Sequence, residues 1–199
     1  MRSMRLTTSL VASVASDRIG LITGLEAAWP GSMLVGPALT VRTSAGDNYA
    51  IHRALASAKK GIVIVVQLDG DVSAGHWGEL MTIAAQVRGV AGLVIDGPIR
   101  DRAQIAERAF PAFHRGTDPF PAAKIAPGVI AEPVTIRGVP VAPGDLICGD
   151  GDGVVVIPQS IVGEVLAAAE TRAGWEERAA TELQDGRTTL EVLGRRLDE

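Results

Sequence analysis

Three short apolar segments constrain the fold of this chain more than any other feature. They are residues 38–41 (Ala-Leu-Thr-Val), 62–66 (Ile-Val-Ile-Val-Val) and 92–95 (Gly-Leu-Val-Ile). Because apolar side chains follow one another instead of alternating with polar ones, each segment is expected to be a strand covered on both faces. Such strands are typical of a sheet with parallel pairing.

Two helical patterns lie between these strands. In residues 47–60 the apolar stripe is Ile51, Ala54, Leu55 and Ala58, with Asp47 or Asn48 as the N-cap and Gly61 as the end. In residues 78–88 the predicted stripe is Leu80, Ile83, Ala84 and Val87, and Gly89 ends the helix. The order of strands and helices indicates an α/β fold.

The pattern changes after residue 133. Residues 133–158 form short β-rich segments separated by turn signals, which predict antiparallel hairpins at one edge of a mixed sheet. A long helix is expected from about residue 159 to 184, and a short one over residues 188–197. No linker divides the chain, so we predict one domain over residues 1–199 with a C-terminal helical extension.

Composition excludes several classes of protein. The 199 residues are 47% hydrophobic, which excludes a disordered chain. The net charge is −4 and the basic residues are scattered, which argues against binding to nucleic acid. Cys148 is the only cysteine, so a disulfide framework and a cysteine-based zinc site are excluded. Without a membrane span or a signal-peptide pattern, we expect a cytoplasmic protein with no membrane partner.

The segment most suggestive of chemistry begins at Gly78-Glu79-Leu80-Met81 and ends at Arg100-Asp101. Twenty residues separate Glu79 from Arg100, and they are predicted to form one helix and one returning strand. This spacing allows Glu79, Arg100 and Asp101 to meet. The alternative is a helix whose first turn carries an acid for its dipole, with an unrelated Arg-Asp turn on the surface.

If the three residues meet, each suits a distinct role. The amides of a helix N-terminus bind carboxylates, and Gly78 permits close backbone approach. Arg100 offers a planar fork for a carboxylate or an enolate, and Asp101 offers oxygen ligands for Mg²⁺. Glu79 suits a base or the anchor of a water molecule.

Four motifs occur in an order that resembles one family. They are Gly46-Asp47-Asn48, the segment 95–101 (Ile-Asp-Gly-Pro-Ile-Arg-Asp), Pro143-Gly144-Asp145 and the segment 152–158 (Asp-Gly-Val-Val-Val-Ile-Pro). Together they resemble the family of the regulator of ribonuclease activity A (RraA), over about residues 30–170. That family includes metal-dependent aldolases acting on 4-hydroxy-4-methyl-2-oxoglutarate and 4-carboxy-4-hydroxy-2-oxoadipate. A methyltransferase is not indicated, because no strand–GxGxxG–helix unit is present.

The resemblance implies a layered β/β/α domain that forms homotrimers or hexamers, with sites at subunit interfaces. It implies that Gly78, Glu79, Leu80 and Met81 surround the carboxylate of pyruvate, that Arg100 contacts the oxo acid, and that Asp101 binds Mg²⁺ or Mn²⁺. The family's aldolases usually have Asp where this chain has Glu79. The expected activity is retro-aldol cleavage of a 4-hydroxy-2-oxo acid to pyruvate, with oxaloacetate decarboxylation by the same chemistry. The alternative is a non-catalytic regulator that binds a ribonuclease or a helicase.

Other polar residues are given ordinary roles. His52, His76 and His114 lack zinc-ligand spacing, although His76 and Glu79 form an i, i+3 pair that would allow contact. Lys124 is a weak candidate for a Schiff base because prolines surround it, and Cys148 is expected to be buried in a strand. Residues 150–153 predict a hairpin turn, and Gly46-Asp47-Asn48 a helix cap or a polar wall of the site.

Overall fold

The structure, a computed structural model, describes residues 6–70 and 73–195. Its strands are β1 (Gly20–Ile22), β2 (Glu26–Ala27), β3 (Leu34–Ser44), β4 (Val63–Asp69), β5 (Gly92–Ile95), β6 (Ala112–His114), β7 (Val129–Ile130), β8 (Val134–Ile136), β9 (Val139–Val141), β10 (Leu146–Asp150) and β11 (Gly153–Ile157). Its helices are α1 (Thr8–Ala15), α2 (Tyr49–Ser57), α3 (Glu79–Val87), α4 (Arg102–Glu107), the 3₁₀ turn η1 (Gln159–Ile161), α5 (Val162–Gln184) and α6 (Thr189–Val192).

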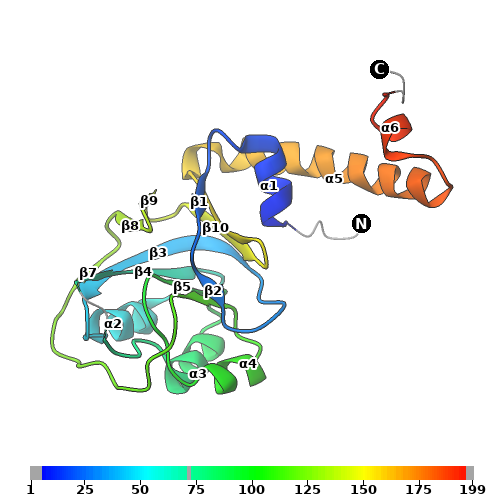
Figure 1. The fold of residues 1–199 in the computed structure, drawn as a ribbon. Helices are drawn as coiled ribbons and strands as arrows, with labels where there is room; N and C mark the ends of the chain where they lie inside the picture. The colour runs from blue at the N-terminus through cyan, green and yellow to red at the C-terminus, as the bar shows by residue number, and fades with distance from the viewer. Residues whose placement is uncertain (1–5, 71–72, 196–199) are drawn as a thin grey trace.

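A mixed sheet of nine strands forms the centre, in the order β1-β11-β10-β3-β4-β5-β6-β2, with β7 paired to β3 (Figure 1). Strands β3, β4, β5 and β6 are parallel, whereas β10, β11, β1 and β2 pair antiparallel with their neighbours. The predicted α/β fold class with a mixed sheet is therefore confirmed. The predicted hairpins are also present, since β10–β11 joins this sheet and β8–β9 forms a separate pair.

Strand β4 shows why the apolar segments are continuous. Ile64 and Val66 pack into a cluster with α2 and α3, whereas Val63 and Val65 pack into a cluster on the opposite face with β8 and β9. All four side chains are fully buried. Covering both faces removes these four consecutive side chains from water, which is the arrangement that the sequence predicts for the apolar segment.

The helices lie in two groups (Figure 1). Helices α2, α3 and α4 cover one face of the parallel strands, while α1 and the first half of α5 pack together near β10 and β11. Helix α5 ends at the predicted residue, Gln184, and its second half extends away from the sheet. The last helix is shorter than predicted, covering Thr189–Val192, and residues 196 and 197 of that prediction lie outside the described residues.

The buried face of α3 differs from the prediction. Met81, Thr82 and Ala85 are buried, while Leu80 and Val87 of the predicted stripe are 76% and 84% exposed. The cause is a polar contact that periodicity does not reveal. The buried hydroxyl of Thr82 accepts a hydrogen bond from Trp77 Nε1 at 2.8 Å and donates to the Gly78 carbonyl at 3.1 Å. Helix α3 is thereby rotated so that Leu80 faces outward.

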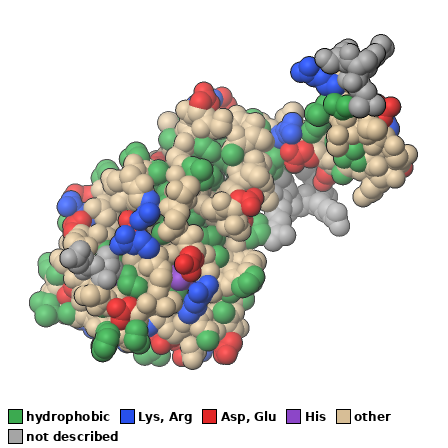
Figure 2. Space-filling view, in the orientation of Figure 1, with side chains coloured by type: hydrophobic (Ala, Val, Ile, Leu, Met, Phe, Trp, Pro, Cys, Tyr) green, Lys and Arg blue, Asp and Glu red, His purple; other side chains and the backbone are tan. Residues whose placement is uncertain are grey.

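The surface carries no dominant charge on the face shown in Figure 2, where basic and acidic side chains are interspersed. No helix among the described residues is long and apolar enough to cross a membrane.

Candidate active site

The loops that follow the parallel strands meet at one edge of the sheet. Isolated bridges link them side by side, joining Asp47 to Ala123, Gly75 to Pro121 and Ile99 to Thr117. In open α/β sheets the carboxyl ends of the strands are where ligands bind, since loops of different strands converge there. The predicted site residues lie in these loops and in the helices that begin after them.

Trp77 fixes the start of α3. Its ring is fully buried and stacks on Phe110 with 5.8 Å between centroids. The Trp77 carbonyl accepts a hydrogen bond from the Arg100 amide at 2.8 Å, so the segment before α3 is tied to the turn after β5. The helix and the strand between Glu79 and Arg100 therefore bring the chain back to the start of α3, as predicted.

Glu79, Arg100 and Asp101 do meet. The Glu79 amide donates to Asp101 Oδ2 at 3.0 Å, and Arg100 Nε lies 3.6 Å from the same oxygen. The side chains of Arg100 and Asp101 are 36% and 40% exposed, so both remain accessible to a ligand. The Glu79 carboxylate points to another partner, Arg108, whose Nη2 donates to Glu79 Oε1 at 2.7 Å.

Two backbone features show how closely these residues approach. A Cβ atom at Gly78 would lie 2.6 Å from Asp101 Oδ2, so only glycine leaves room for the carboxylate there. Asp101 has φ of 55°, in the left-handed region that non-glycine residues seldom adopt. Such strain, of order 1–3 kcal/mol, concentrates at functional sites.

A pocket of about 220 Å³ opens beside the start of α3. Its lining residues are Asn48, His52, Gly75, Gly78, Leu80, Met81, Arg100, Pro121, Ala122 and Lys124. Four of the predicted site residues, Gly78, Leu80, Met81 and Arg100, therefore share one cavity. Glu79 and Asp101 do not line it, but Asp101 borders it through its contact with Gly78.

The pocket includes three further polar side chains, of which the sequence predicts only Asn48, as part of a polar wall of the site. Lys124 adds a second cation beside Arg100, on an exposed loop as predicted. The pKa of His52 is lowered by burial and by the charge of Lys124. Asn48 Oδ1 is buried with no hydrogen-bond partner among the described residues, while its amide donates to the His76 carbonyl at 2.9 Å. Only the fold brings these residues, which lie on α2 and on a distant loop, to α3.

Asp47 and His76 hold the loops that carry these side chains. Asp47 Oδ2 accepts from the amides of Ile125 and Ala126 at 2.7 and 3.0 Å, and Oδ1 accepts from the Tyr49 amide at 2.8 Å, beside Asn48, which is the N-cap of α2. His76 is fully buried, and its Nε2 accepts from the Gly46 amide at 2.9 Å. The Glu79 carboxylate binds Arg108, whereas the His76 carbonyl accepts from Asn48, so His76 contacts the site through a residue that lines the pocket.

The described residues contain no group of three or more His, Cys, Asp or Glu side chains that could hold a metal ion. Among the described acidic residues, Asp101 borders the pocket, with Oδ2 held by the Glu79 amide at 3.0 Å. Mg²⁺ is often bound by one or two carboxylates and keeps several water molecules. A half-exposed Asp101 beside a polar pocket fits that kind of weak binding.

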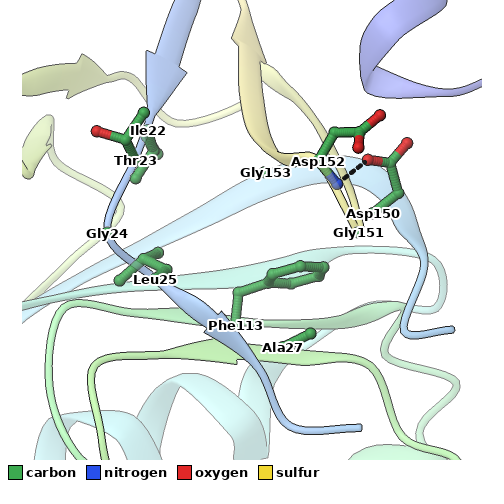
Figure 3. A pocket seen from close by; sticks show the side chains of 10 residues that line it. All are labelled: Ile22, Thr23, Gly24, Leu25, Ala27, Phe113, Asp150, Gly151, Asp152 and Gly153. Carbon is green, nitrogen blue, oxygen red and sulfur yellow. Dashed lines mark hydrogen bonds between the residues drawn. The ribbon is translucent and has the colours of Figure 1, made fainter. Parts of the chain in front are cut away.

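A second pocket, of about 140 Å³, lies between the β1–β2 connection and the turn from β10 to β11 (Figure 3). The Asp150 carboxylate stabilises the turn. It accepts hydrogen bonds from the amides of Asp152 and Thr8 at 3.0 and 2.8 Å and from the Thr8 hydroxyl. Residues 150–153 therefore form a hairpin turn, as predicted. None of the described lining residues is basic, so this pocket does not suit an oxo acid.

Cys148 is buried in β10, as predicted, and burial raises the pKa of its thiol to about 12. An un-ionised thiol is a poor nucleophile, so Cys148 has a packing role.

Comparison with known proteins places the chain in a family. Residues 10–156 match the RraA-like family, described as Aldolase/RraA. A protein of Halalkalibacterium halodurans named "Putative 4-hydroxy-4-methyl-2-oxoglutarate aldolase" is 34% identical over 180 residues, covering 90% of this chain and 86% of its own. The chain belongs to the RraA-like family.

Solved structures agree with this assignment. An uncharacterized protein from Pseudomonas syringae pv. tomato superposes on this RraA-like chain with a TM-score of 0.83 and 30% identity, covering 94% of this chain and 89% of its own. A Streptomyces coelicolor protein, described as an unusual member of the RNase ES inhibitor RraA family, gives 0.77 and 30%, covering 88% and 92%. Relatives of this RraA-like chain thus include proteins named as aldolases and as ribonuclease inhibitors.

Acid should destabilise this RraA-like fold through its buried histidines. Burial lowers the pKa of His76 and of His114, although nearby backbone carbonyls oppose the shift. The unfolded chain binds protons below about pH 6.5, whereas the folded chain does not until a lower pH. The free energy of unfolding should therefore be retained above pH 6.5 and fall as the pH drops below about 6.5. Urea unfolding across this range measures it, and stability that rises on acidification would contradict the buried neutral state of both rings.

Proposed function

We propose that this chain is a divalent-metal-dependent lyase that cleaves a 4-hydroxy-2-oxo acid to pyruvate. The observation that carries the proposal is the convergence of Arg100, Lys124 and the first turn of α3 on one pocket, with the Asp101 carboxylate at its border. Two cations and free helix amides suit a substrate with two carboxylates. The family relationship supports the same reaction class, since several relatives are named as aldolases.

The chain's own residues account for substrate binding. First-turn amides of a helix have no partner within the helix, so those of Leu80 and Met81 suit the carboxylate next to the keto group. The Arg100 guanidinium would bind the oxo acid with charge-assisted hydrogen bonds. Lys124 would bind the second carboxylate.

The cleavage step follows from this arrangement. Loss of the C4 hydroxyl proton to a water molecule forms a carbonyl at C4 as the C3–C4 bond breaks. The electron pair of that bond stays on C3, giving the enolate of pyruvate, whose negative charge the Arg100 guanidinium stabilises. Mg²⁺ or Mn²⁺ held by Asp101 would supply Lewis-acid stabilisation of the same charge. Oxaloacetate decarboxylation passes through the same enolate.

Release of pyruvate tests the proposal directly. The substrates to compare are 4-hydroxy-4-methyl-2-oxoglutarate, 4-carboxy-4-hydroxy-2-oxoadipate and oxaloacetate, each with Mg²⁺, with EDTA, and with Mg²⁺ or Mn²⁺ restored after EDTA. Pyruvate should form with the metal, disappear with EDTA and return on restoration. Full activity in EDTA would contradict the role of the metal. Absence of pyruvate from all three, with binding to a ribonuclease, would favour the regulator.

Substitutions of Arg100 and of Lys124 should separate the roles of these two side chains. Arg100→Lys keeps the charge but loses the planar fork, so kcat should fall about 10²–10³-fold, the cost of losing one donor to a developing oxyanion. Lys124→Met should instead raise KM by at least about 10-fold, as expected for a lost charged hydrogen bond. Lys59→Met, an exposed lysine at the end of α2, is the matched control. Wild-type kcat in Arg100→Lys would refute its assignment.

We also propose that the chain assembles as a homotrimer or hexamer. Leu80, Phe120 and Ile125 are 76%, 70% and 82% exposed, and Leu80 lines the pocket. Exposed large apolar side chains near a site are typical of a surface that another subunit covers. Light scattering should give a mass of three or six chains, whereas a fully active monomer would exclude a shared site.

A further inference from the structure

Arg108 is connected to α3 at both ends of that helix. It caps the C-terminus of α4, and its Nε and Nη2 donate to Glu79 Oε1 at 3.1 and 2.7 Å. Its own carbonyl accepts from Gln86 Nε2, near the end of α3, at 2.8 Å. Arg108 therefore joins α4 to the first and the last turn of α3.

Glu79 in turn contacts both ends of α4. Its amide donates to Asp101, at the start of α4, and its carboxylate receives Arg108, at the end. The residue that fixes the Asp101 carboxylate through its backbone is thus fixed through its side chain by Arg108. Asp101 is the acid that borders the pocket, and its left-handed backbone leaves it dependent on such contacts.

The length of the Glu79 side chain matters for this connection. An aspartate is shorter by one carbon–carbon bond, about 1.5 Å, and would lose the 2.7 Å contact unless the backbone moved. Arg108 therefore lies at the distance that a glutamate at position 79 reaches.

We propose that Arg108 is a positioning residue, which holds Glu79 and thereby keeps the first turn of α3 and the Asp101 carboxylate in the geometry that binds a divalent cation. The inference rests on the proposed function, because it assumes that Asp101 binds the cation. Glu79 then acts through its position and not as the base.

A purely structural role for the pair would give a different result. The Arg108 and Glu79 side chains are 36% and 35% exposed, and ion pairs of this kind contribute little to folding. Losing such a pair would leave the affinity for metal unchanged. Losing the support of a metal ligand typically weakens metal binding 10–100-fold.

Binding of Mn²⁺ to the full chain, followed by the electron paramagnetic resonance signal of free Mn²⁺, tests the proposal without substrate. Arg108→Met should raise the Kd for Mn²⁺ about 10-fold, at the lower end of that range because the pair is half-exposed. Arg108→Lys keeps the charge and one donor nitrogen and should recover most of the affinity. Arg88→Met, on the exposed C-cap of α3, is the matched control and should bind Mn²⁺ as the wild type does.

A double-substitution cycle shows whether Arg108 acts through Glu79. Glu79→Asp should weaken Mn²⁺ binding about as much as Arg108→Met, and the two together should be no worse than either alone. Thermal unfolding confirms that each variant is folded at the temperature of the titration, and Arg108→Gln replaces Arg108→Met if the latter does not fold.

Three results would overturn the inference: a Kd within twofold of wild type in Arg108→Met, tighter binding in that variant, or additive losses in the cycle. In each of these the wild type still binds Mn²⁺, and the proposed function stands. A wild-type chain that does not bind Mn²⁺ would overturn both.

Discussion

The parallel pairing of β3, β4, β5 and β6 is the constraint on which the rest of the structure depends. Parallel strands end at the same edge of a sheet, so the loops after them must meet there. Three isolated bridges join these loops: Asp47 to Ala123, Gly75 to Pro121, and Ile99 to Thr117. Both faces of β5 and of the first four residues of β4 are covered, and polar side chains of distant segments gather at the edge where these strands end.

The sequence predicts those parts of the fold and the site that depend on contacts close in the chain. The three apolar segments lie in β3, β4 and β5, although β3 extends beyond the predicted residues 38–41 in both directions. The twenty residues between Glu79 and Arg100 form one helix and one strand. A strand that runs back along a helix ends near the residue at which the helix begins. That local geometry is why Glu79, Arg100 and Asp101 could be predicted to meet.

Other features depend on contacts that periodicity does not record. Two apolar stripes are available on α3, and the hydrogen bond between Trp77 and Thr82 decides between them. Lys124 reaches the pocket because Asp47 binds the amides that follow it, across more than seventy residues of sequence. The partner of Glu79, Arg108, lies on a short helix that the sequence analysis did not predict.

The site combines opposite charges in a small space. Arg100 and Lys124 line the pocket, while Asp101 stands at its border with one oxygen held by the amide of Glu79. This separation suits the proposed substrate, with one carboxylate at the start of α3, the other at Lys124, and the keto group near Arg100 and a metal on Asp101. A strained aspartate beside two cations and a helix N-terminus supports the proposed lyase over the alternative of a regulator.

The most direct test of this account is the position of a bound metal. Crystals of the protein grown with Mn²⁺ and pyruvate allow the ion to be located by its anomalous scattering. The account predicts a peak about 2.1 Å from an oxygen of Asp101, with the pyruvate carboxylate at the start of α3. A peak confined to another acidic segment, such as the turn at residues 150–152, with no metal at Asp101, would contradict it.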